Sequence, residues 1–366
     1  MDFSSISRRR LLQGSAALTL GTALGARTAA AADTTIGFIY VGSRDDYGYN
    51  QAHAVAAAAL KKMPGIKVVE EEKVPETDAV EKTMESMINL DGATLLFPTS
   101  FGYYSPHVLK MASKYPKIHF EHCGGLWTDK DPKNAGSYFG YIDEAQYVAG
   151  IVAGYTSKTG KLGFVAAHPI GPVNWTINAY ELGAQKMNPK ATVTVIFTGA
   201  WNDPVKERAA AQAMADQGID VIGQHVDTPT PQVVAQERGI YGTGHHRDLR
   251  EFAPKATLCS SAWTWDKHLG PTLKKIIAGN WEPSPYGAFP GIKDGGTDIA
   301  CCSSVVPKEA VDKVMAERQA IIDGKQIYAG PLKDTNGVER VAAGKNLDDA
   351  GLWKMDWFVP GVITQK

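Results

Sequence analysis

The sequence predicts an α/β protein built from two doubly wound, Rossmann-like lobes that are joined by a hinge. From residue 35 onward, short apolar runs rich in β-branched residues alternate with stretches that have the length of helices. Parallel strands need crossover connections, and these stretches are long enough to provide them. The alternation restarts after residue 140 without a low-complexity linker, so two similar lobes are expected in one chain.

The first lobe begins with a predicted βα unit. Residues 35–41 form an apolar, β-branched strand pattern, and the alanine-rich residues 50–63 follow as a helix. The alternation then continues with strands at 67–69, 94–97 and 118–121 and helices at 78–89 and 105–114.

The second lobe repeats this order of elements. Its predicted helices are residues 144–158, 175–187, 204–217 and 231–238, and its predicted strands are residues 161–166, 192–198, 221–224 and 239–243. The last part of the chain adds a strand at 257–262, a helix at 266–278, a return through 287–292 and 297–303, and a helix at 307–323.

The chain is expected to cross between the lobes several times, which is typical of a hinged clamp. The predicted crossings lie near residues 137–142, 261–265 and 295–301. They divide the protein into a first lobe of residues 33–140 plus 265–297 and a second lobe of residues 141–264 plus 298–366. Ligands of open α/β sheets bind beyond the carboxyl ends of the strands. Two facing lobes therefore predict one cleft lined by the loops that follow strands.

Residues 1–32 resemble a twin-arginine export signal. Three arginines at residues 8–10 precede a mildly apolar run at residues 11–24, and three alanines at residues 30–32 favour cleavage near Ala32. The run is too short for a membrane span. The alternative is a basic amphipathic arm of a cytosolic protein. The signal predicts that the mature protein lies in the periplasm.

Composition and motifs narrow the class of function. The 366 residues include 38 Lys and Arg against 39 Asp and Glu. The chain therefore lacks the excess of positive charge that is typical of nucleic-acid-binding proteins. The sequence contains neither a dinucleotide fingerprint nor a P-loop, and neither a serine nucleophile elbow nor a zinc-protease motif. We therefore expect no nucleic-acid partner, no cofactor and no enzyme activity.

The cysteines and a histidine pair are not expected to form a functional site. None of the four cysteines forms a C-x-x-C pair, and the adjacent Cys301 and Cys302 are awkward for a mutual disulfide or a metal. Four cysteines in an oxidising compartment allow three full pairings, which the sequence does not distinguish, and reduced, buried cysteines are the favoured alternative. His245 and His246, close to Asp248, are expected to lie in a surface turn. No metal is predicted.

Loops after strands of the first lobe supply the first candidate binding residues. The loop after the first strand contains Asp46, Tyr49 and Asn50, of which Asn50 is also a candidate helix N-cap. The loop after the strand at 94–97 places Ser100 beside the aromatic ring of Phe101. Phe101 could stack on a ligand ring or pack in the core beneath its loop.

Tryptophans near strand ends are the stronger signal in the second half of the chain. Aromatic faces bind flat or apolar solutes by stacking, and neighbouring carboxylates can accept hydrogen bonds from a ligand's N–H or O–H groups. The candidates are Trp175, Trp201, Trp263 and Trp265, with the carboxylates Asp227 and Asp266.

Many short segments together resemble the basic membrane protein family of substrate-binding proteins. The resemblance covers nearly all of the chain after the signal, and its segments are residues 37–42, 46–50, 99–103, 115–122, 147–150, 177–179, 198–207, 223–227 and 355–362. It implies a type I periplasmic binding protein fold, a permease of an ABC importer as partner, a purine base or nucleoside as ligand, and a monomer.

The resemblance also implies roles for particular residues. The family's aromatic sandwich around the base corresponds to Tyr49 and Trp201, and its hydrogen-bonding groups correspond to Asp46 and Asn50. Nucleoside-binding members hold ribose with a Gly, Asp and Lys group, which the late segments here lack, so a base such as adenine is expected ahead of its nucleoside. The alternatives are a ligand-sensing module for a membrane signalling partner and an exported enzyme.

Overall fold

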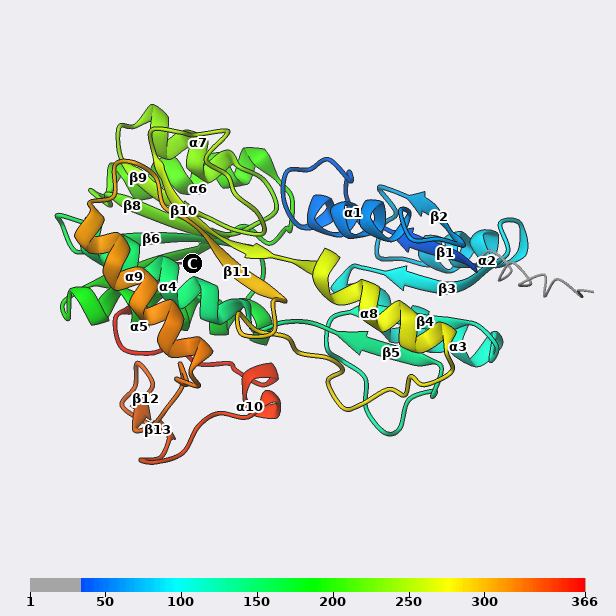
Figure 1. Ribbon diagram of the computed structural model, residues 1–366. Helices are drawn as coiled ribbons and strands as arrows, with labels where there is room; N and C mark the ends of the chain where they lie inside the picture. Colours follow the sequence, from blue (N-terminus) through cyan, green and yellow to red (C-terminus); the bar gives the residue numbers. More distant parts are fainter. Residues whose placement is uncertain (1–33, 366) are drawn as a thin grey trace, which may run out of the picture. The chain divides into compact units, whose positions relative to one another are not determined.

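The computed structural model describes residues 34–365 and confirms the predicted α/β class with two lobes. Figure 1 shows β1 to β5 in one half of the molecule and β6, β8, β9 and β10 in the other. The expectations for residues 1–32 fall outside the described residues.

The first lobe is built on a five-stranded parallel sheet. Its strand order is β2-β1-β3-β4-β5, with β1 in the interior and β2 at one edge. Five of the six residues of β1 are buried, as expected for a parallel strand covered by helices on both faces. The strands are β1 (Thr34–Ile39), β2 (Ile66–Glu71), β3 (Ala93–Pro98), β4 (His119–Cys123) and β5 (Ala135–Tyr138).

The second lobe is built on a seven-stranded sheet of order β11-β10-β9-β8-β6-β7-β14. All neighbouring strands are parallel except β11, which pairs antiparallel with β10. The strands are β6 (Lys161–Ala166), β7 (Thr192–Phe197), β8 (Val221–His225), β9 (Tyr241–Gly244), β10 (Thr257–Trp263), β11 (Thr297–Cys301) and β14 (Val362–Gln365).

Helices follow most strands, as crossover connections require. The first lobe contains α1 (Tyr49–Leu60), α2 (Ala79–Asn89), a short 3₁₀ turn (Phe101–Tyr103), a π-helical turn (Tyr104–Val108) and α3 (Leu109–Lys114), and α8 (Trp265–Ile277) packs against α1. The second lobe contains α4 (Ile142–Thr156), α5 (Gly171–Met187), α6 (Pro204–Asp216), α7 (Thr230–Glu237) and α9 (Lys308–Ile322).

The helices α4 and α5 pack unusually closely in the core of the second lobe. A Cβ atom on Gly150 of α4 would lie 2.1 Å from the carbonyl oxygen of Tyr180, and one on Gly183 of α5 would lie 2.0 Å from that of Tyr147. The two backbones therefore touch where only glycine fits.

The chain passes between the two sheets three times. It does so between β5 and α4, between β10 and α8, and between α8 and β11. Backbone hydrogen bonds tie these passages together, because the Phe139 N–H donates to the Ala288 carbonyl (2.9 Å) and the Thr264 N–H donates to the Gly296 carbonyl (3.0 Å). The connection is thus a bundle of three short segments.

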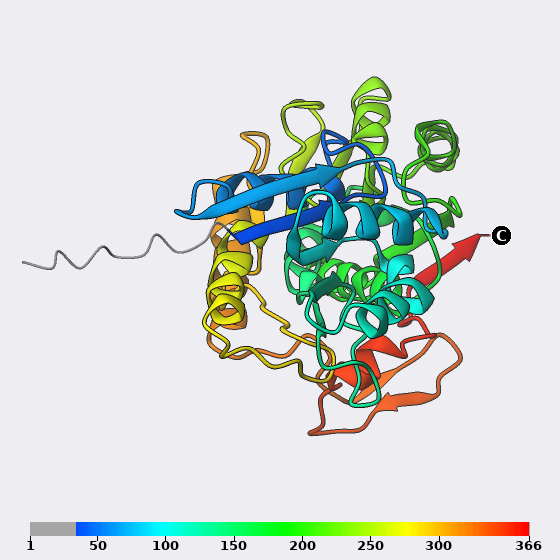
Figure 2. The same cartoon turned by 90° about the vertical axis from the view of Figure 1, so that its right-hand side faces the viewer.

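Several elements differ from the sequence-based expectation. β5 lies where only a crossing was predicted, because Ala135–Tyr138 offers small residues and no apolar run. Residues 287–292 form no strand beyond a single bridge from Ala288 to Tyr138. The C-terminal segment adds β12 (Leu332–Lys333), β13 (Glu339–Val341) and α10 (Asp349–Trp353), which lie at the lower side of the molecule in both views (Figures 1 and 2).

The cysteines only partly follow expectation. Cys123 and Cys259 are buried and free, whereas Cys301 and Cys302 are joined in a disulfide between sequence neighbours. The prediction of reduced cysteines was therefore wrong for that pair. Among the helices within residues 34–365, none is both long and apolar enough to cross a membrane.

Candidate functional site

A cavity lies between the two lobes, at the carboxyl ends of their strands, and its empty space together with the solvent at its mouth is about 500 Å³. This is where open α/β sheets place their ligands. Most of its wall is apolar or aromatic, and the charged or titratable side chains in it are few. The lining residues are Val41, Tyr49, Ser100, Phe101 and Cys123 of the first lobe, Phe139 of a crossing, and Ile170, Pro172, Trp201, His225, Asp227, His246 and Trp263 of the second lobe.

Aromatic side chains enter the cavity from both lobes. Tyr49 is the first residue of α1, and its hydroxyl donates to the Thr99 carbonyl at 2.5 Å, which fixes the ring at the cavity wall. Trp201 comes from the loop between β7 and α6 of the other lobe. The structure thus brings Tyr49 and Trp201 to the same cavity, together with the predicted Ser100 and Phe101.

Asp46 organises the start of α1 and does not line the cavity. Its carboxylate accepts hydrogen bonds from the backbone N–H groups of Gly48 (2.9 Å), Asn50 (3.1 Å) and Gln51 (3.0 Å) and from the Asn50 side chain (2.7 Å). These bonds satisfy N–H groups that a helix start leaves unpaired. Both side chains hold the loop that presents Tyr49, and neither is among the residues that line the cavity.

Three other predicted residues also lie outside the cavity wall. Trp175 of α5 is completely buried and packs edge-on against Phe139, behind the lining. Trp265 is also completely buried and stacks on Trp263 with ring centroids 4.3 Å apart, so only Trp263 faces the cavity. Asp266 is exposed on α8 and borders a separate depression. A tryptophan near a strand end can point into its own lobe, and the sequence does not distinguish these directions.

The polar part of the wall comes mainly from the second lobe. Asp227 follows β8 and is buried, and burial raises the pKa of its carboxyl well above the usual range, with Asp46 and Glu207 adding to the shift. Its backbone N–H donates to the Trp201 carbonyl at 2.9 Å. Asp227 and Trp201 are therefore held as one unit.

Three histidines beside Asp227 were not among the predicted site residues. His225 ends β8, and His245 and His246 follow β9. His245 and His246 are 0% and 2% exposed, so the expected surface turn is wrong. Burial lowers the pKa of His225 to about 4 and lowers the pKa values of the other two well below the usual range, so all three rings are neutral at pH 7. Their positions directly after strands were the signal that could have found them.

The two lobes touch at the rim of the cavity. Gly48 of the first lobe approaches the backbone of Asp227 so closely that a Cβ atom would lie 1.9 Å from the Asp227 carbonyl oxygen. The guanidinium of Arg247 donates to the side-chain oxygen of Gln51, and the rings of Tyr47 and Phe252 lie 4.6 Å apart. The cavity is therefore enclosed by contacts between the lobes.

Comparison with known proteins gives consistent results. A family model described as "ABC transporter substrate-binding protein PnrA-like" matches residues 33–329. The chain is 34% identical over 350 residues to a purine-binding protein of Brucella abortus, covering 94% of this chain and 97% of that relative. It is 33% identical over 295 residues to a Haloferax volcanii protein provisionally named an ABC transporter glucose-binding protein, TsgA13, covering 80% of this chain and 73% of that relative.

The fold is also found among solved structures. A solute-binding protein of an ABC transporter system from Aeropyrum pernix superposes with a TM-score of 0.67 at 20% identity, covering 80% of this chain and 92% of that chain. This likeness concerns the architecture of the two lobes.

Proposed function

The chain belongs to the PnrA-like family of ABC transporter substrate-binding proteins, and from this premise we propose that its ligand is a purine base such as adenine. The observation that carries the proposal is an enclosed, largely aromatic cavity with Tyr49 on one lobe and Trp201 on the other. Two facing aromatic side chains suit a planar ring, and each such contact contributes about 0.5 to 1.5 kcal/mol beyond the area that it buries.

The polar groups of the cavity support a heteroaromatic ligand over a sugar. Asp227, His225 and His246 lie on one part of the wall, while the remainder is mostly apolar. A sugar carries hydroxyl groups around its whole ring, and each one left unpaired in a buried site costs about 1 to 3 kcal/mol. A purine base carries its donors and acceptors in the ring plane and leaves both faces free for stacking.

The same argument favours a base over its nucleoside. Trp263 and Phe139 form the part of the cavity wall that is nearest to the passages between the lobes. The ring of Trp263 stacks on that of Trp265, which lies outside the cavity. No lysine or arginine of residues 34–365 is among the lining residues. A ribose would bring three hydroxyl groups to a surface with few partners for them, so the nucleoside is expected to bind more weakly.

In this proposal the ligand holds the lobes closed, and the closed form is the one that the permease recognises. The three hydrogen-bonded crossings provide a hinge. We place the lobes at residues 33–140 plus 265–297 and 141–264 plus 298–366. The protein acts in the periplasm as a monomer after removal of residues 1–32.

Calorimetric titration tests the ligand class. Adenine, guanine, hypoxanthine, adenosine, guanosine and glucose are added separately to protein stripped of ligand by unfolding and refolding. We expect a base to bind more tightly than the corresponding nucleoside and glucose to give no heat. Preference for a nucleoside would refute the argument about ribose, and binding of glucose alone would refute the purine assignment. Mass spectrometry of the small molecule that co-purifies is the independent check.

A further inference from the structure

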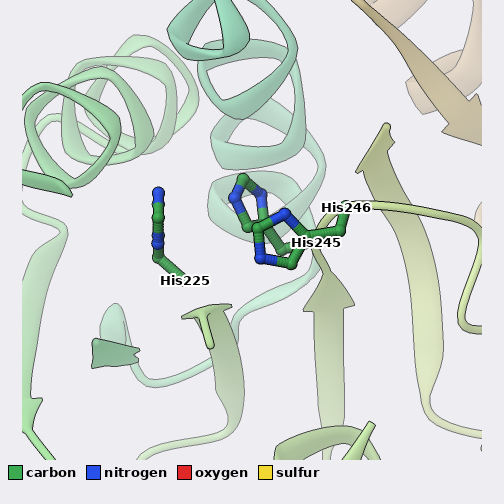
Figure 3. Close-up of side chains that lie close together, drawn as sticks. All are labelled: His225, His245 and His246. Atoms are coloured by element: carbon green, nitrogen blue, oxygen red, sulfur yellow. The ribbon is translucent and has the colours of Figure 1, made fainter. Parts of the chain in front are cut away.

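The side chains of His225, His245 and His246 form a compact group (Figure 3), and two of them, His225 and His246, line the cavity. The ring centroids of His225 and His245 are 4.4 Å apart and those of His245 and His246 are 4.0 Å apart. One nitrogen from each ring lies within 4.8 Å of the others. Buried, neutral imidazoles this close together suit either of two uses, ligation of a transition metal or hydrogen bonding to an organic ligand.

The environment of His246 fixes where its ring proton lies. The indole N–H of Trp263 can only donate, and it lies 2.9 Å from Nδ1 of His246, so Nδ1 is the acceptor. A neutral imidazole then carries its proton on Nε2. This Nε2 is 3.1 Å from Oδ1 of Asp227, but the contact lacks hydrogen-bond geometry, so among the described residues Nε2 has no hydrogen-bond partner.

The environment of His245 does not fix a tautomer. The side-chain nitrogen of Gln146 donates to the Gln224 carbonyl at 3.1 Å, which sets the orientation of the amide. The same nitrogen lies 3.1 Å from Nδ1 of His245, and the Ser261 hydroxyl, which can donate or accept, lies 2.6 Å from that Nδ1. The proton of His245 is therefore compatible with either ring nitrogen.

This arrangement is unsuited to a metal ion. A metal ligand must be an unprotonated nitrogen, and a ligating histidine normally donates its other ring N–H to a neighbour. In His246 the second nitrogen already accepts a hydrogen bond from Trp263, so ligation through its Nε2 would require removal of the only proton on a neutral ring. Fixed donors, by contrast, are what an organic ligand with acceptor atoms requires.

We propose that His225 and His246 are specificity-determining residues for a heteroaromatic ligand, with Trp263 as the positioning residue that fixes the His246 tautomer. His246 presents an N–H donor, Asp227 beside it presents carboxyl oxygens, and His225 lines the cavity with both ring nitrogens unpaired within the described part of the chain. The ligand edge that fits carries a ring-nitrogen acceptor next to an N–H donor, as purine edges do. This inference rests on the proposed function for the ligand class.

Paired substitutions test the two histidines by calorimetry, with the purine that binds most tightly in the titration series. His225→Leu and His246→Leu remove the hydrogen-bonding groups and should each weaken binding at least tenfold. His225→Gln keeps one donor and one acceptor and should stay within about threefold of wild type. His268→Leu is the matched control, because His268 lies on α8 and does not line this cavity; its affinity should be unchanged. Thermal unfolding verifies that each variant is folded.

Nitrogen NMR of the full chain labelled with ¹⁵N-histidine tests the tautomers directly and does not depend on the ligand. Long-range ¹H–¹⁵N correlations should show Nε2–H in His246, and the His246 signals should change in Trp263→Phe, which lacks the indole donor. Zn²⁺ added alone should not bind stoichiometrically. A proton on Nδ1 of His246, or one equivalent of Zn²⁺ that His225→Leu no longer binds, would overturn the proposal.

The proposed function and the role of the histidines can be refuted separately. If wild-type protein binds no purine, the proposed function fails, and the NMR and Zn²⁺ results still decide the role of the histidines. If wild-type protein binds a purine and both leucine variants retain its affinity, only the inference about the histidines fails.

Discussion

A close backbone contact between the lobes makes Gly48 a sensitive test of closure. In Gly48→Ala the new Cβ would lie 1.9 Å from the carbonyl oxygen, 2.7 Å from the carbonyl carbon and 3.0 Å from the Cα of Asp227. All three atoms belong to the backbone, so no side-chain rotation relieves the clash. Ordinary contact begins at 3.4 Å, and the lobes must therefore separate by about 1.5 Å (3.4 − 1.9) at this point.

A separation of this size removes close contact between the ligand and one lobe. Loss of one aromatic face costs about 0.5 to 1.5 kcal/mol, and loss of buried apolar area adds to it. At about 1.4 kcal/mol per tenfold change in Kd, we expect Gly48→Ala to weaken binding by roughly ten- to a hundredfold. Calorimetry measures the affinity, and small-angle scattering with saturating ligand should show a larger radius of gyration than wild type.

Gly270→Ala is the matched control for Gly48→Ala. Gly270 lies in α8, and a Cβ there would meet only Leu60 at 3.9 Å, so affinity should be unchanged and the helix slightly stabilised. If Gly48→Ala binds and compacts like wild type, the view that this contact marks the closed form is refuted.

Further measurements address the aromatic sandwich, the helix start and a buried carboxyl group. Tyr49→Ala and Trp201→Ala should each weaken purine binding by at least about 1.5 kcal/mol in calorimetry, with the fold retained; wild-type affinity in both would exclude the sandwich. Asp46→Ala should lower the free energy of unfolding in urea by about 1 to 2 kcal/mol, because the N–H groups at the start of α1 lose their acceptor, and an unchanged midpoint would contradict the capping role. Burial raises the pKa of Glu144 to about 7 from 4.5, so the folded state holds this proton more tightly and wild-type stability should fall as pH rises from about 4.5 to about 7. Glu144→Gln retains an oxygen for the Ile292 N–H and should be more stable than wild type by about 2 to 3 kcal/mol at pH 8, but not at pH 4; an equal difference at both pH values would exclude this carboxyl as the cause.

The sequence was most informative where a strand pattern led directly into a helix. The strand at 161–166 was predicted with its observed bounds, and most other elements within a few residues. Periodicity carries this information because each strand buries both faces and each crossover helix covers one. The short β5 was missed because it contains small residues. The C-terminal strands were missed because they are only 2, 3 and 4 residues long, and the last of them is held by pairing with the distant β7.

The site was predictable only to the level of the loops that form it. Tyr49 and Trp201 were found because aromatic residues stand out between a strand and the following helix, and the family resemblance then assigned them to one sandwich. Whether a side chain in such a loop faces the other lobe depends on helix geometry and on the opposite wall. The Asp46 carboxylate accepts hydrogen bonds from N–H groups of its own helix. Trp175 packs inside its own lobe. His246 was assigned to the solvent because the lobe that covers it is distant in sequence.

Trp263 connects the binding wall to the hinge. Its indole N–H fixes the ring of His246, and its backbone N–H donates to the His246 carbonyl at 3.0 Å. The next residue, Thr264, donates to Gly296 in the neighbouring passage between the lobes. Because this tryptophan is both the last residue of β10 and the step before α8, the hydrogen-bonding wall and the crossing cannot move independently. The polar groups that we propose to select the ligand are therefore anchored to a segment that passes between the lobes.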